Sequence, residues 1–442
     1  MGFFNHKINI GLFLVYNVYN MSKYIKNFKE LASTEARKNA LEIVSAGYES
    51  IDTENVIKKQ VWIEQEILHI DGQKFDLNKY EKIYILGCGK VACSAAFYLE
   101  RILKAYVDEG AVVGISEGVC EIVETFKGTH PLPSEANFQA SKRMQEIGAK
   151  ATENDLVFVI VGGGGSALLC GSSVEHKQGE RLYNKFLKSG GDISELNTVR
   201  KHISDLKGGG LAKALYPATV VGLIFSDIPG DDYPDVASGP TYIDETTIED
   251  AQKIIEKYSL GEFDLIETPK DKKFFEKVNN IVLVSNNVAL KAMKEKAEAL
   301  GYDSLIVANN LYGDPKETAK FLIEKSKPGR VVLAGGEISL TIPEGCDGKG
   351  GRNDYLAMEM LDHIKKGDVF VSFASDGHDN TDSAGAIIDF DTKNDLELKE
   401  VKIEKHKVCL DSYTLFEYTN NLIFTGDLES NVSDLMILLS EK

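Results

Sequence analysis

Short apolar runs alternate with segments of helical periodicity over most of the chain. Between residues 22 and 59, apolar side chains recur at three- and four-residue spacing, which predicts two helices. Residues 62–75 contain apolar runs around an Asp71-Gly72 turn, which predicts a short β-hairpin. Further on, the pattern predicts strands over 83–86, 111–115, 156–161 and 220–225, the first followed by a helix that reaches Leu103.

The predicted strands are continuous and rich in β-branched residues. Such runs are typical of strands that are buried on both faces, so we expect a Rossmann-like parallel sheet covered by helices. Sheets of this kind bind ligands in the loops that follow the carboxyl ends of their strands. The three most conspicuous glycine-rich or acidic loops of this half all fall at such positions.

A charged, irregular segment near residues 260–273 is followed by a second series of apolar runs. These runs predict strands over 281–284, 304–308, 331–334 and 369–373. With 442 residues the chain is also longer than one hydrophobic core usually spans. We therefore predict an α/β protein of two α/β domains, the first over 21–265 and the second over 275–442. Residues 1–20 are interpreted as a mis-called or disordered extension, with Met1 and Met21 as alternative starts.

The balance of charge narrows the classes of partner. Lys and Arg number 50 against 68 Asp and Glu, a formal net charge of −18, which disfavours nucleic acid and anionic membrane surfaces as partners. The six cysteines are scattered and contain no CxxC pair, which gives no support for a zinc site or a disulfide framework and fits a reducing compartment, so we expect a cytoplasmic location. The oligomeric state stays open, a homo-oligomer included.

The first glycine loop, Gly87-Cys88-Gly89-Lys90-Val91-Ala92, follows a predicted strand and opens a helix. It matches the G-x-G-x-x-A pattern of dinucleotide sites, and Glu117 stands where a ribose-binding carboxylate is expected. This interpretation makes an NAD(P)H-dependent reductase a competing hypothesis. Lys90, however, would place a positive charge at the phosphate position, which suits phosphoryl transfer better.

The second loop is Gly162-Gly163-Gly164-Gly165-Ser166. It lacks the spacing of a Walker A loop, but successive backbone N–H groups with a serine at a helix start favour an anion nest over a simple packing turn. Gly163, Gly164, Gly165 and Ser166 are therefore candidate phosphate-binding residues.

Charged residues supply the remaining candidates of the first half. Arg200 and Lys201 belong to a basic segment whose local charge is opposite to that of the chain, and either is a candidate for gripping a substrate carboxylate. Asp227 follows the strand predicted over 220–225 and is a candidate Mg²⁺ ligand, because magnesium needs only one or two protein carboxylates beside phosphate oxygens.

In the second half, Gly336 and Glu337 follow the strand predicted over 331–334 and are candidates for nucleotide or phosphate contact. Arg352 opens a predicted helix after several glycines, where a guanidinium suits neutralising charge on a moving phosphoryl group. Asp376 lies in an acidic loop after the strand predicted over 369–373 and is a second candidate Mg²⁺ ligand.

Taken together, these motifs resemble the glycerate 2-kinase family, whose C-terminal part is the MOFRL domain, here about 331–440. The resemblance extends from Phe28 to Leu439. It rests on the order of several segments: 87–92, Thr-His-Pro-Leu-Pro at 129–133, 162–169, Leu-Asn-Thr-Val-Arg-Lys-His at 196–202, 226–232, Ala-Ser-Gly-Pro-Thr at 237–241, 335–337, 348–353 and 375–387.

The resemblance implies transfer of the γ-phosphoryl group of ATP to the 2-hydroxyl of D-glycerate, with Mg²⁺. By motif, the family's essential lysine and arginine fall on Lys90 and Arg352. It also implies an active site in the cleft between two α/β domains. The chain departs from the family at residues 426–431, where Gly-Pro-Thr-Gly-Thr-Asn is expected and Gly-Asp-Leu-Glu-Ser-Asn stands, and at Asp379-Asn380.

Three alternatives to this activity stay open at this point. The family has also been labelled hydroxypyruvate reductase, which agrees with the dinucleotide interpretation of residues 87–92. A kinase for another small hydroxy acid and a non-catalytic nucleotide-binding regulator are the others. Within the kinase hypothesis, either Asp227 or Asp376 would accept the hydroxyl proton.

Overall fold

The computed structural model describes residues 23–230 and 232–442, which form two compact units. Unit 2 is the contiguous segment 52–285, and unit 1 joins the described residues up to 51 with residues 286–442. The extension predicted over residues 1–20 lies outside the described residues. Each unit is α/β, as predicted.

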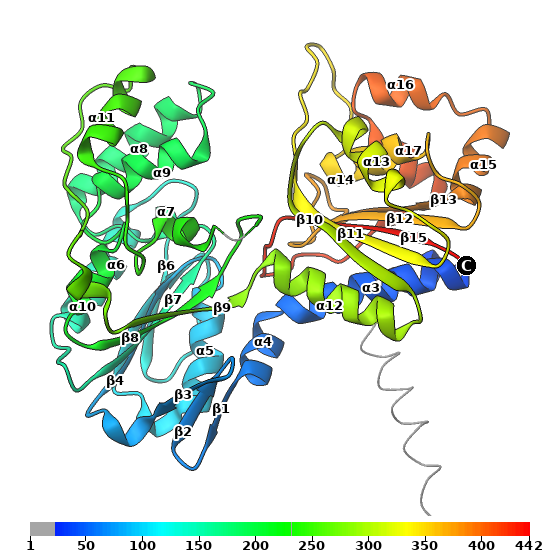
Figure 1. The fold of residues 1–442 in the computed structure, drawn as a ribbon. Coiled ribbons are helices and arrows are strands. Elements are labelled where there is room, and N and C mark those ends of the chain that lie inside the picture. Colours follow the sequence, from blue (N-terminus) through cyan, green and yellow to red (C-terminus); the bar gives the residue numbers. More distant parts are fainter. Residues whose placement is uncertain (1–22, 231) are drawn as a thin grey trace, which may run out of the picture. The chain divides into compact units, whose positions relative to one another are not determined.

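Unit 2 is built on a parallel sheet whose strand order is β6-β5-β4-β7-β8-β9 (Figure 1). Its strands are β4 (Ile83–Cys88), β5 (Glu109–Gly114), β6 (Val123–Lys127), β7 (Leu156–Gly162), β8 (Thr219–Phe225) and β9 (Val278–Val284). Every residue of β4 and β7 is buried, which is why both appear in the sequence as unbroken apolar runs.

Helices cover this sheet on both sides (Figure 1). The helices of unit 2 are α4 (Thr53–Gln60), α5 (Ala92–Leu103), α6 (Glu135–Gly148), α7 (Gly165–Leu168), α8 (Ser173–Phe186), α9 (Ile193–His202), α10 (Gly210–Leu215) and α11 (Ile248–Lys257), with 3₁₀ turns η1 (Leu77–Lys79), η2 (Lys104–Tyr106), η3 (Tyr233–Ser238) and η4 (Lys272–Phe275). The main core lies between the sheet and its helices, and a second apolar cluster joins α8, α9 and α11.

The hairpin predicted over 62–75 is the main part of a small antiparallel sheet. Strands β1 (Val61–Glu64), β2 (Ile67–Ile70) and β3 (Gln73–Asp76) pair in chain order, and Asp71-Gly72 forms the turn between β2 and β3. Gly72 has a φ of +78°, a conformation that glycine adopts without strain.

Unit 1 is built on a mixed sheet with the order β10-β11-β15-β12-β13-β14. Its strands are β10 (Asp303–Gly313), β11 (Arg330–Ile338), β12 (Asp368–Ala374), β13 (Gly385–Asp389), β14 (Leu422–Ile423) and β15 (Asp434–Ser440). Of the described strand pairs, β10 with β11 is parallel and the others are antiparallel. The last strand of the chain, β15, lies between β11 and β12 and is buried along its whole length.

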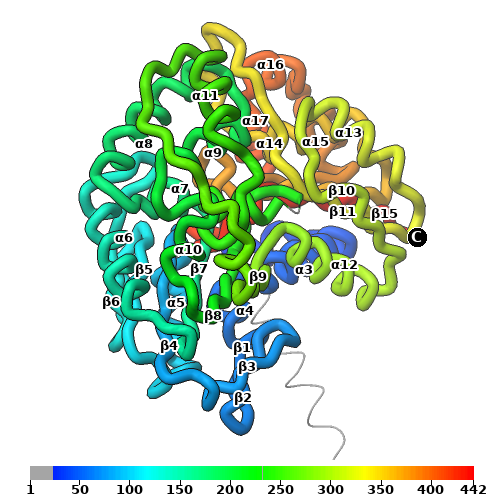
Figure 2. Tube along the Cα trace, turned by 60° about the vertical axis from the view of Figure 1, so that its left-hand side comes forward, coloured from blue at the N-terminus to red at the C-terminus, as the bar shows by residue number. Residues whose placement is uncertain are grey.

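Helices cover this second sheet as well. The helices of unit 1 are α2 (Phe28–Leu31), α3 (Glu35–Ile51), α12 (Asn286–Ala299), α13 (Pro315–Glu324), α14 (Arg352–Met360), α15 (Phe390–Leu398), α16 (Ile403–Val408) and α17 (Ser412–Thr419). Figure 2 shows α3 and α12 side by side, although about 240 residues separate them in the sequence. At the end of the sheet, the Tyr48 hydroxyl on α3 donates to the Ala374 carbonyl at 3.0 Å.

The division of the chain differs from the predicted boundaries of 21–265 and 275–442. The segment 258–277 is not a linker, because the chain returns after it to add β9 beside β8 in the first sheet. The strand predicted over 281–284 is thus part of unit 2. Residues 28–51 belong to unit 1, because the apolar face of α3 packs on α12 and on strands of the second sheet.

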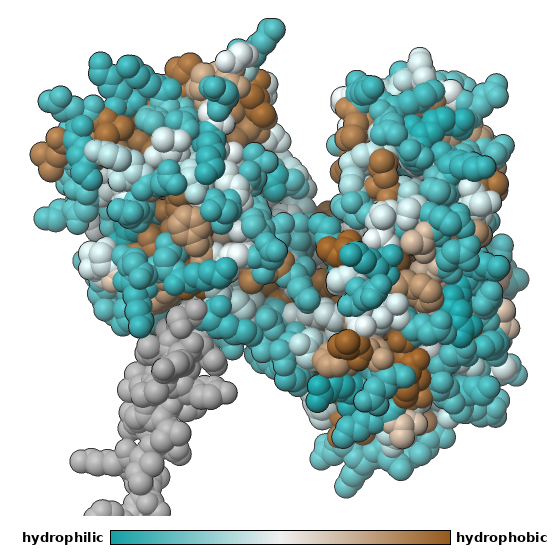
Figure 3. Space-filling model, turned by 180° about the vertical axis from the view of Figure 1, so that it is seen from behind, coloured by the Kyte–Doolittle hydropathy of each residue, from teal (hydrophilic) through white to brown (hydrophobic). Residues whose placement is uncertain are grey.

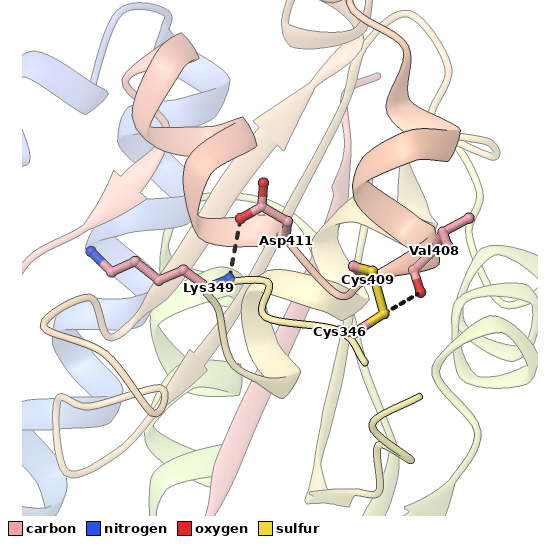
Figure 4. Close-up of a disulfide and its surroundings, with 5 residues drawn as sticks. All are labelled: Cys346, Lys349, Val408, Cys409 and Asp411. Carbon is pink, nitrogen blue, oxygen red and sulfur yellow. Dashed lines mark hydrogen bonds between the residues drawn. A yellow bond between two sulfur atoms is a disulfide. The ribbon is translucent and has the colours of Figure 1, made fainter. Parts of the chain in front are cut away.

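A second correction concerns the cysteines. Cys346 and Cys409 form a disulfide with Cα atoms 5.0 Å apart, although the scattered spacing of the cysteines gave no support for a disulfide framework (Figure 4). The bond ties the loop before α14 to the end of α16. Beside it, the Lys349 backbone N–H donates to an Asp411 carboxylate oxygen at 3.1 Å.

The part of the surface that Figure 3 shows is mainly hydrophilic, as the composition of the chain leads us to expect. On the face shown in Figure 3, hydrophilic residues predominate and apolar residues are confined to small groups. A search for helices long and apolar enough to span a bilayer found none among the described residues.

Candidate active-site residues

The loops after β4 and β7 in unit 2 are joined through their backbones. A Cβ on Gly89, whose φ is +132°, would lie only 2.6 Å from the Cα atom of Gly162. The backbone N–H of Lys90 donates to the Gly163 carbonyl at 2.9 Å, and that of Gly89 donates to the Val113 carbonyl. The G-x-G pattern therefore serves close packing between two loops, and these two N–H groups are not available to a pyrophosphate.

In the second loop, each glycine makes room for a different neighbour. A Cβ on Gly163 would lie 2.3 Å from a carboxylate oxygen of Asp227, which follows β8. Gly164, with a φ of +74°, leaves space for two side chains: a Cβ there would be 3.0 Å from the His130 ring and 3.3 Å from the Lys90 Cγ atom. Larger residues at these positions would displace the groups that the loop brings together.

A chain of hydrogen bonds links this loop to α9. The Ser166 and Ser238 hydroxyls lie 2.9 Å apart, and Ser238 also donates to the Asn197 side-chain oxygen at 3.3 Å. The same oxygen accepts from the Arg200 guanidinium at 3.3 Å. The predicted phosphate-loop serine and the predicted carboxylate-binding arginine thus belong to one network.

Arg200 borders a small cavity in unit 2 and carries a positive charge that no carboxylate of the described residues pairs with. The cavity is also lined by Pro131, Ser166 and Ile203, and the Arg200 guanidinium lies 5.9 Å from the centre of the Tyr183 ring. Burial lowers the pKa of Arg200 to about 10. A desolvated guanidinium without a counter-charge is a favourable site for a small carboxylate.

Lys201, the alternative candidate, is placed differently. Its side chain is buried, and its amino group lies 2.8 Å from an Asp235 carboxylate oxygen and 3.4 Å from one of Asp244. Burial opposes the charged form, but the two carboxylates outweigh it and raise the pKa of Lys201. The structure thus gives this lysine an internal ion-pair role rather than a place beside the cavity.

In unit 1, Arg352 is the first residue of α14 and is held by two carboxylates. Its Nε donates to Asp434 at 2.5 Å, and Nη1 donates to Glu337 at 2.7 Å. Glu337 and Gly336 lie inside β11, which extends to Ile338 instead of ending at residue 334 as predicted. Gly336 packs against the backbone of Leu311 on β10. In this structure Glu337 orients Arg352, and Gly336 serves strand pairing, so neither lies in the ligand-binding loop that the sequence predicted.

The carboxylates around the start of α14 are almost fully buried. Asp379 accepts from the backbone N–H groups of Asn353 and Asp354, and the Asn353 amide bridges Asp379 and Asp434 at 3.1 and 2.8 Å. Burial raises the pKa of Asp434 to about 7, with Arg352 opposing the shift. Burial, and next the charge of Asp379, raise the pKa of Asp354 well above its ordinary value.

Asp376, the second predicted Mg²⁺ ligand, follows β12 in unit 1. One of its carboxylate oxygens accepts from the His378 backbone N–H at 3.2 Å. Burial and the charges of Asp376 and Asp434 raise the pKa of Tyr48. Across residues 23–230 and 232–442, no group of three or more His, Cys, Asp or Glu side chains is arranged to hold a metal ion.

Several residues of these clusters were not among the sequence candidates. His130 and Asn137 stand within or just after the Thr-His-Pro-Leu-Pro segment, whose motif was the available signal. Asp434, the buried partner of Arg352, lies 82 residues from it in the sequence, and no local pattern marks the pair.

Two family models match separate segments of the chain, and the first of them includes part of α3, which belongs to unit 1. Residues 39–267 match the family described as a domain of unknown function, DUF4147, and residues 330–434 match the MOFRL family.

Full-length relatives extend the match to most of the chain. A glycerate 2-kinase from Pyrococcus horikoshii is 32% identical over 441 residues, covering 92% of this chain and 98% of that protein. A protein from Agrobacterium vitis with the provisional name hydroxypyruvate reductase is 32% identical, covering 80% of this chain and 98% of its own length.

A crystal structure of glycerate kinase from Thermotoga maritima superposes with a TM-score of 0.78 at 28% identity, covering 91% of this chain and 99% of the other. Sequence, domain composition and fold agree: the chain belongs to the glycerate 2-kinase family.

Proposed function

We propose that the protein is an ATP-dependent kinase that phosphorylates D-glycerate at its 2-hydroxyl to give 2-phosphoglycerate and ADP. The observation that carries this assignment is the 32% identity to a glycerate 2-kinase over 92% of the chain. The arrangement of unit 2 supports it, because Lys90, His130 and Arg200 are gathered near one glycine loop of a protein with a net charge of −18.

In this proposal the substrate carboxylate binds at Arg200. The guanidinium can hold a carboxylate by two parallel hydrogen bonds, and its position beside a small cavity favours a short hydroxy acid over a bulky one. Asn197 and Ser238 fix the direction of the guanidinium and connect it to Ser166. Gly163, Gly164, Gly165 and Ser166 are the proposed phosphate contacts.

Lys90 and Arg352 are proposed to neutralise charge on the phosphoryl group during transfer, the step in which phosphoryl-transfer enzymes supply most of their stabilisation. Lys90 forms no ion pair with any described residue, so its charge is available for an anionic ligand. Arg352 is held by Glu337 and Asp434, which leaves it few alternative side-chain conformations.

Mg²⁺ is proposed as the partner of the ATP phosphates. The residues present fit this need only if the nucleotide supplies most of the oxygen ligands, because no cluster of three metal-ligating side chains occurs in the described parts of the chain. Asp227, at the carboxyl end of β8 and against Gly163, is the carboxylate best placed to contribute in unit 2. Asp376 is the corresponding candidate of unit 1.

The reductase hypothesis has less support in the structure. The loop of residues 87–90 uses its N–H groups and its glycine for internal packing, and Glu117 is exposed in the loop after β5. The name of the Agrobacterium vitis relative is the observation that keeps this activity worth measuring.

The assay that tests the proposal combines purified protein, ATP, Mg²⁺ and D-glycerate, with ADP release and product identity as readouts. We expect ADP release that depends on glycerate and a phosphate on carbon 2. The control replaces ATP with NAD(P)H and D-glycerate with hydroxypyruvate. Oxidation of the nucleotide in that control, without glycerate-dependent ADP release, would reverse the assignment.

A further inference from the structure

His130 lies beside the glycine loop, and the proposed function assigns it no chemical role. The described histidines His202, His378 and His406 each have a ring nitrogen within hydrogen-bond distance of a protein oxygen. His130 has neither a hydrogen bond nor an ion pair with any residue that the structure describes. Its imidazole nitrogens are therefore available to a ligand.

The backbone around His130 is held firmly in place by Asn137, which is fully buried. The Asn137 side-chain amide donates to the carbonyl oxygens of Thr129 and Ala167, both at 2.9 Å, and its oxygen accepts from the Thr129 backbone N–H at 2.8 Å. Ala167 is part of α7, the helix that the glycine loop opens. One buried amide thus fastens the residue before His130 to the element that follows the loop.

This attachment places the imidazole directly against the glycine loop. A Cβ on Gly164 would be 3.3 Å from Nε2 of His130 and 3.3 Å from Cγ of Lys90, so the two side chains share the space that the glycine leaves. A ring nitrogen of His130 consequently lies at the position where the proposed phosphate loop and the proposed catalytic lysine meet.

The charges around His130 favour its neutral form. His130 is exposed to solvent, but partial desolvation by neighbouring atoms lowers its pKa, and the positive charges of Lys90 and Arg200 lower it further. These two cations are the charged groups of the described chain that act on the ring, one from the loop after β4 and the other from α9. A neutral imidazole at physiological pH is a competent proton acceptor.

We propose that His130 is the general base that accepts the proton of the glycerate 2-hydroxyl. The bond from the 2-oxygen to the γ-phosphorus forms, the bond from that phosphorus to the bridging oxygen of ATP breaks, and ADP leaves with that oxygen. The hydroxyl proton passes to a nitrogen of His130 and is later released to solvent. The proposal rests on the proposed function, and it assigns the proton to neither Asp227 nor Asp376.

The test compares wild-type protein with His130→Ala, His130→Gln and the control His69→Ala. His69 lies on β2 and stacks on Trp62, away from the glycine loop, so its loss is expected to leave the rate unchanged. Removing a general base is expected to lower kcat by about 10²-fold while the KM for D-glycerate changes little. Added imidazole is expected to restore part of the rate of His130→Ala and none of that of His130→Gln, whose larger side chain fills the space.

The outcomes separate the two levels of the proposal. If wild-type protein does not phosphorylate glycerate, the proposed function itself fails. If wild-type protein is active and His130→Ala keeps the wild-type kcat, the assignment of His130 as base is wrong. The assignment is also wrong if His130→Ala loses kcat, unfolds at the wild-type temperature and is not rescued by imidazole. The acid limb of the wild-type kcat/KM profile is expected below pH 6.5, and a limb above it contradicts a pKa lowered by the two cations.

Discussion

The clusters around Arg200 and Arg352 differ in how the charge of the arginine is compensated. Arg200 in unit 2 pairs with no carboxylate of residues 23–230 and 232–442, and the nearby Lys90 and the titratable imidazole of His130 add to the positive charge. Arg352 in unit 1 is bound to Glu337 and Asp434, and further buried carboxylates surround the start of its helix.

The difference shows what each cluster lacks. The unit 2 cluster gathers cations that pair with no carboxylate of the described residues, so a bound phosphate or carboxylate is expected to complement it. In the unit 1 cluster the positive charge of Arg352 is already neutralised by carboxylates. These carboxylates fix the direction of the guanidinium and lower its affinity for a further anion. We therefore expect changes in the unit 2 cluster to act through charge, and changes in the unit 1 cluster to act through the orientation of Arg352 and the stability of the buried network.

Lys90→Ala is expected to have the largest effect on activity and almost none on stability. Losing a positive charge that stabilises the transition state should lower kcat by roughly 10³-fold. Because Lys90 makes no ion pair with described residues, the free energy of unfolding should stay within about 0.5 kcal/mol of wild type. Steady-state kinetics and chemical denaturation measure both, with Lys74→Ala, an exposed residue of β3, as the control. Near wild-type turnover would remove Lys90 from the catalytic group.

Arg352→Ala is expected to lower both activity and stability, unlike Lys90→Ala. The change leaves Asp434, which is 1% exposed, without its counter-charge, and we expect a loss of about 2 kcal/mol in the free energy of unfolding. The loss should be larger at pH 8 than at pH 6, because Asp434 can take up a proton at the lower pH. The matched control is Arg330→Ala, whose partner Asp303 is exposed and whose cost should stay below about 1 kcal/mol. Equal costs for the two variants would contradict the comparison.

Asp434→Asn tests the balanced cluster through the pH dependence of stability. The pKa of Asp434 is about 7 in the folded protein against an ordinary value of 3.8, so its proton stabilises the fold at low pH. That contribution is fully present below about pH 4 and is lost as the pH rises through 7. Between pH 5 and pH 8, wild-type protein should therefore lose about 3 kcal/mol relative to Asp434→Asn. Denaturation curves at several pH values decide this, and parallel pH profiles would show that Asp434 does not titrate in this range.

Arg200→Gln is expected to give the smallest effect, an upward shift in the pKa of His130. Removing this cation makes protonation of His130 easier, so the pKa of the imidazole should rise towards 6.5. The acid limb of kcat/KM should move upward by less than about one pH unit, while the KM for D-glycerate increases. Arg101→Gln, an exposed change on α5, should move neither. A limb that stays in place would separate Arg200 from His130 electrostatically.

The sequence predicted the parallel sheet and the positions of its loops well, because strands buried on both faces leave an unmistakable apolar run. It predicted the domain boundary poorly. The irregular segment near residues 260–273 has the composition of a linker, yet the residues that follow it form β9 of the first sheet. Local pattern does not say which sheet a strand joins, since that choice depends on packing between residues far apart in the chain.

Some residues of the candidate site were predictable from the sequence and others were not. Lys90 and Arg200 stand in local motifs, and the structure brings both close to His130. The partners that define Arg352 could not be found by pattern, because Glu337 and Asp434 come from two strands that pair only in the folded sheet. The same holds for Cys346 and Cys409, which are 63 residues apart.

The place of β15 in the second sheet sets an order for biosynthesis. This strand consists of residues 434–440 and lies between β11 and β12, while α3 from the beginning of the chain packs in the same unit. Unit 2 leaves the ribosome as one uninterrupted segment and can fold during translation. Unit 1 is complete only when residues 434–440 have been synthesised, because β15 fills the place between β11 and β12. Removal of residues 434–442 is therefore expected to leave unit 2 folded and both segments of unit 1 without a complete sheet to pack on.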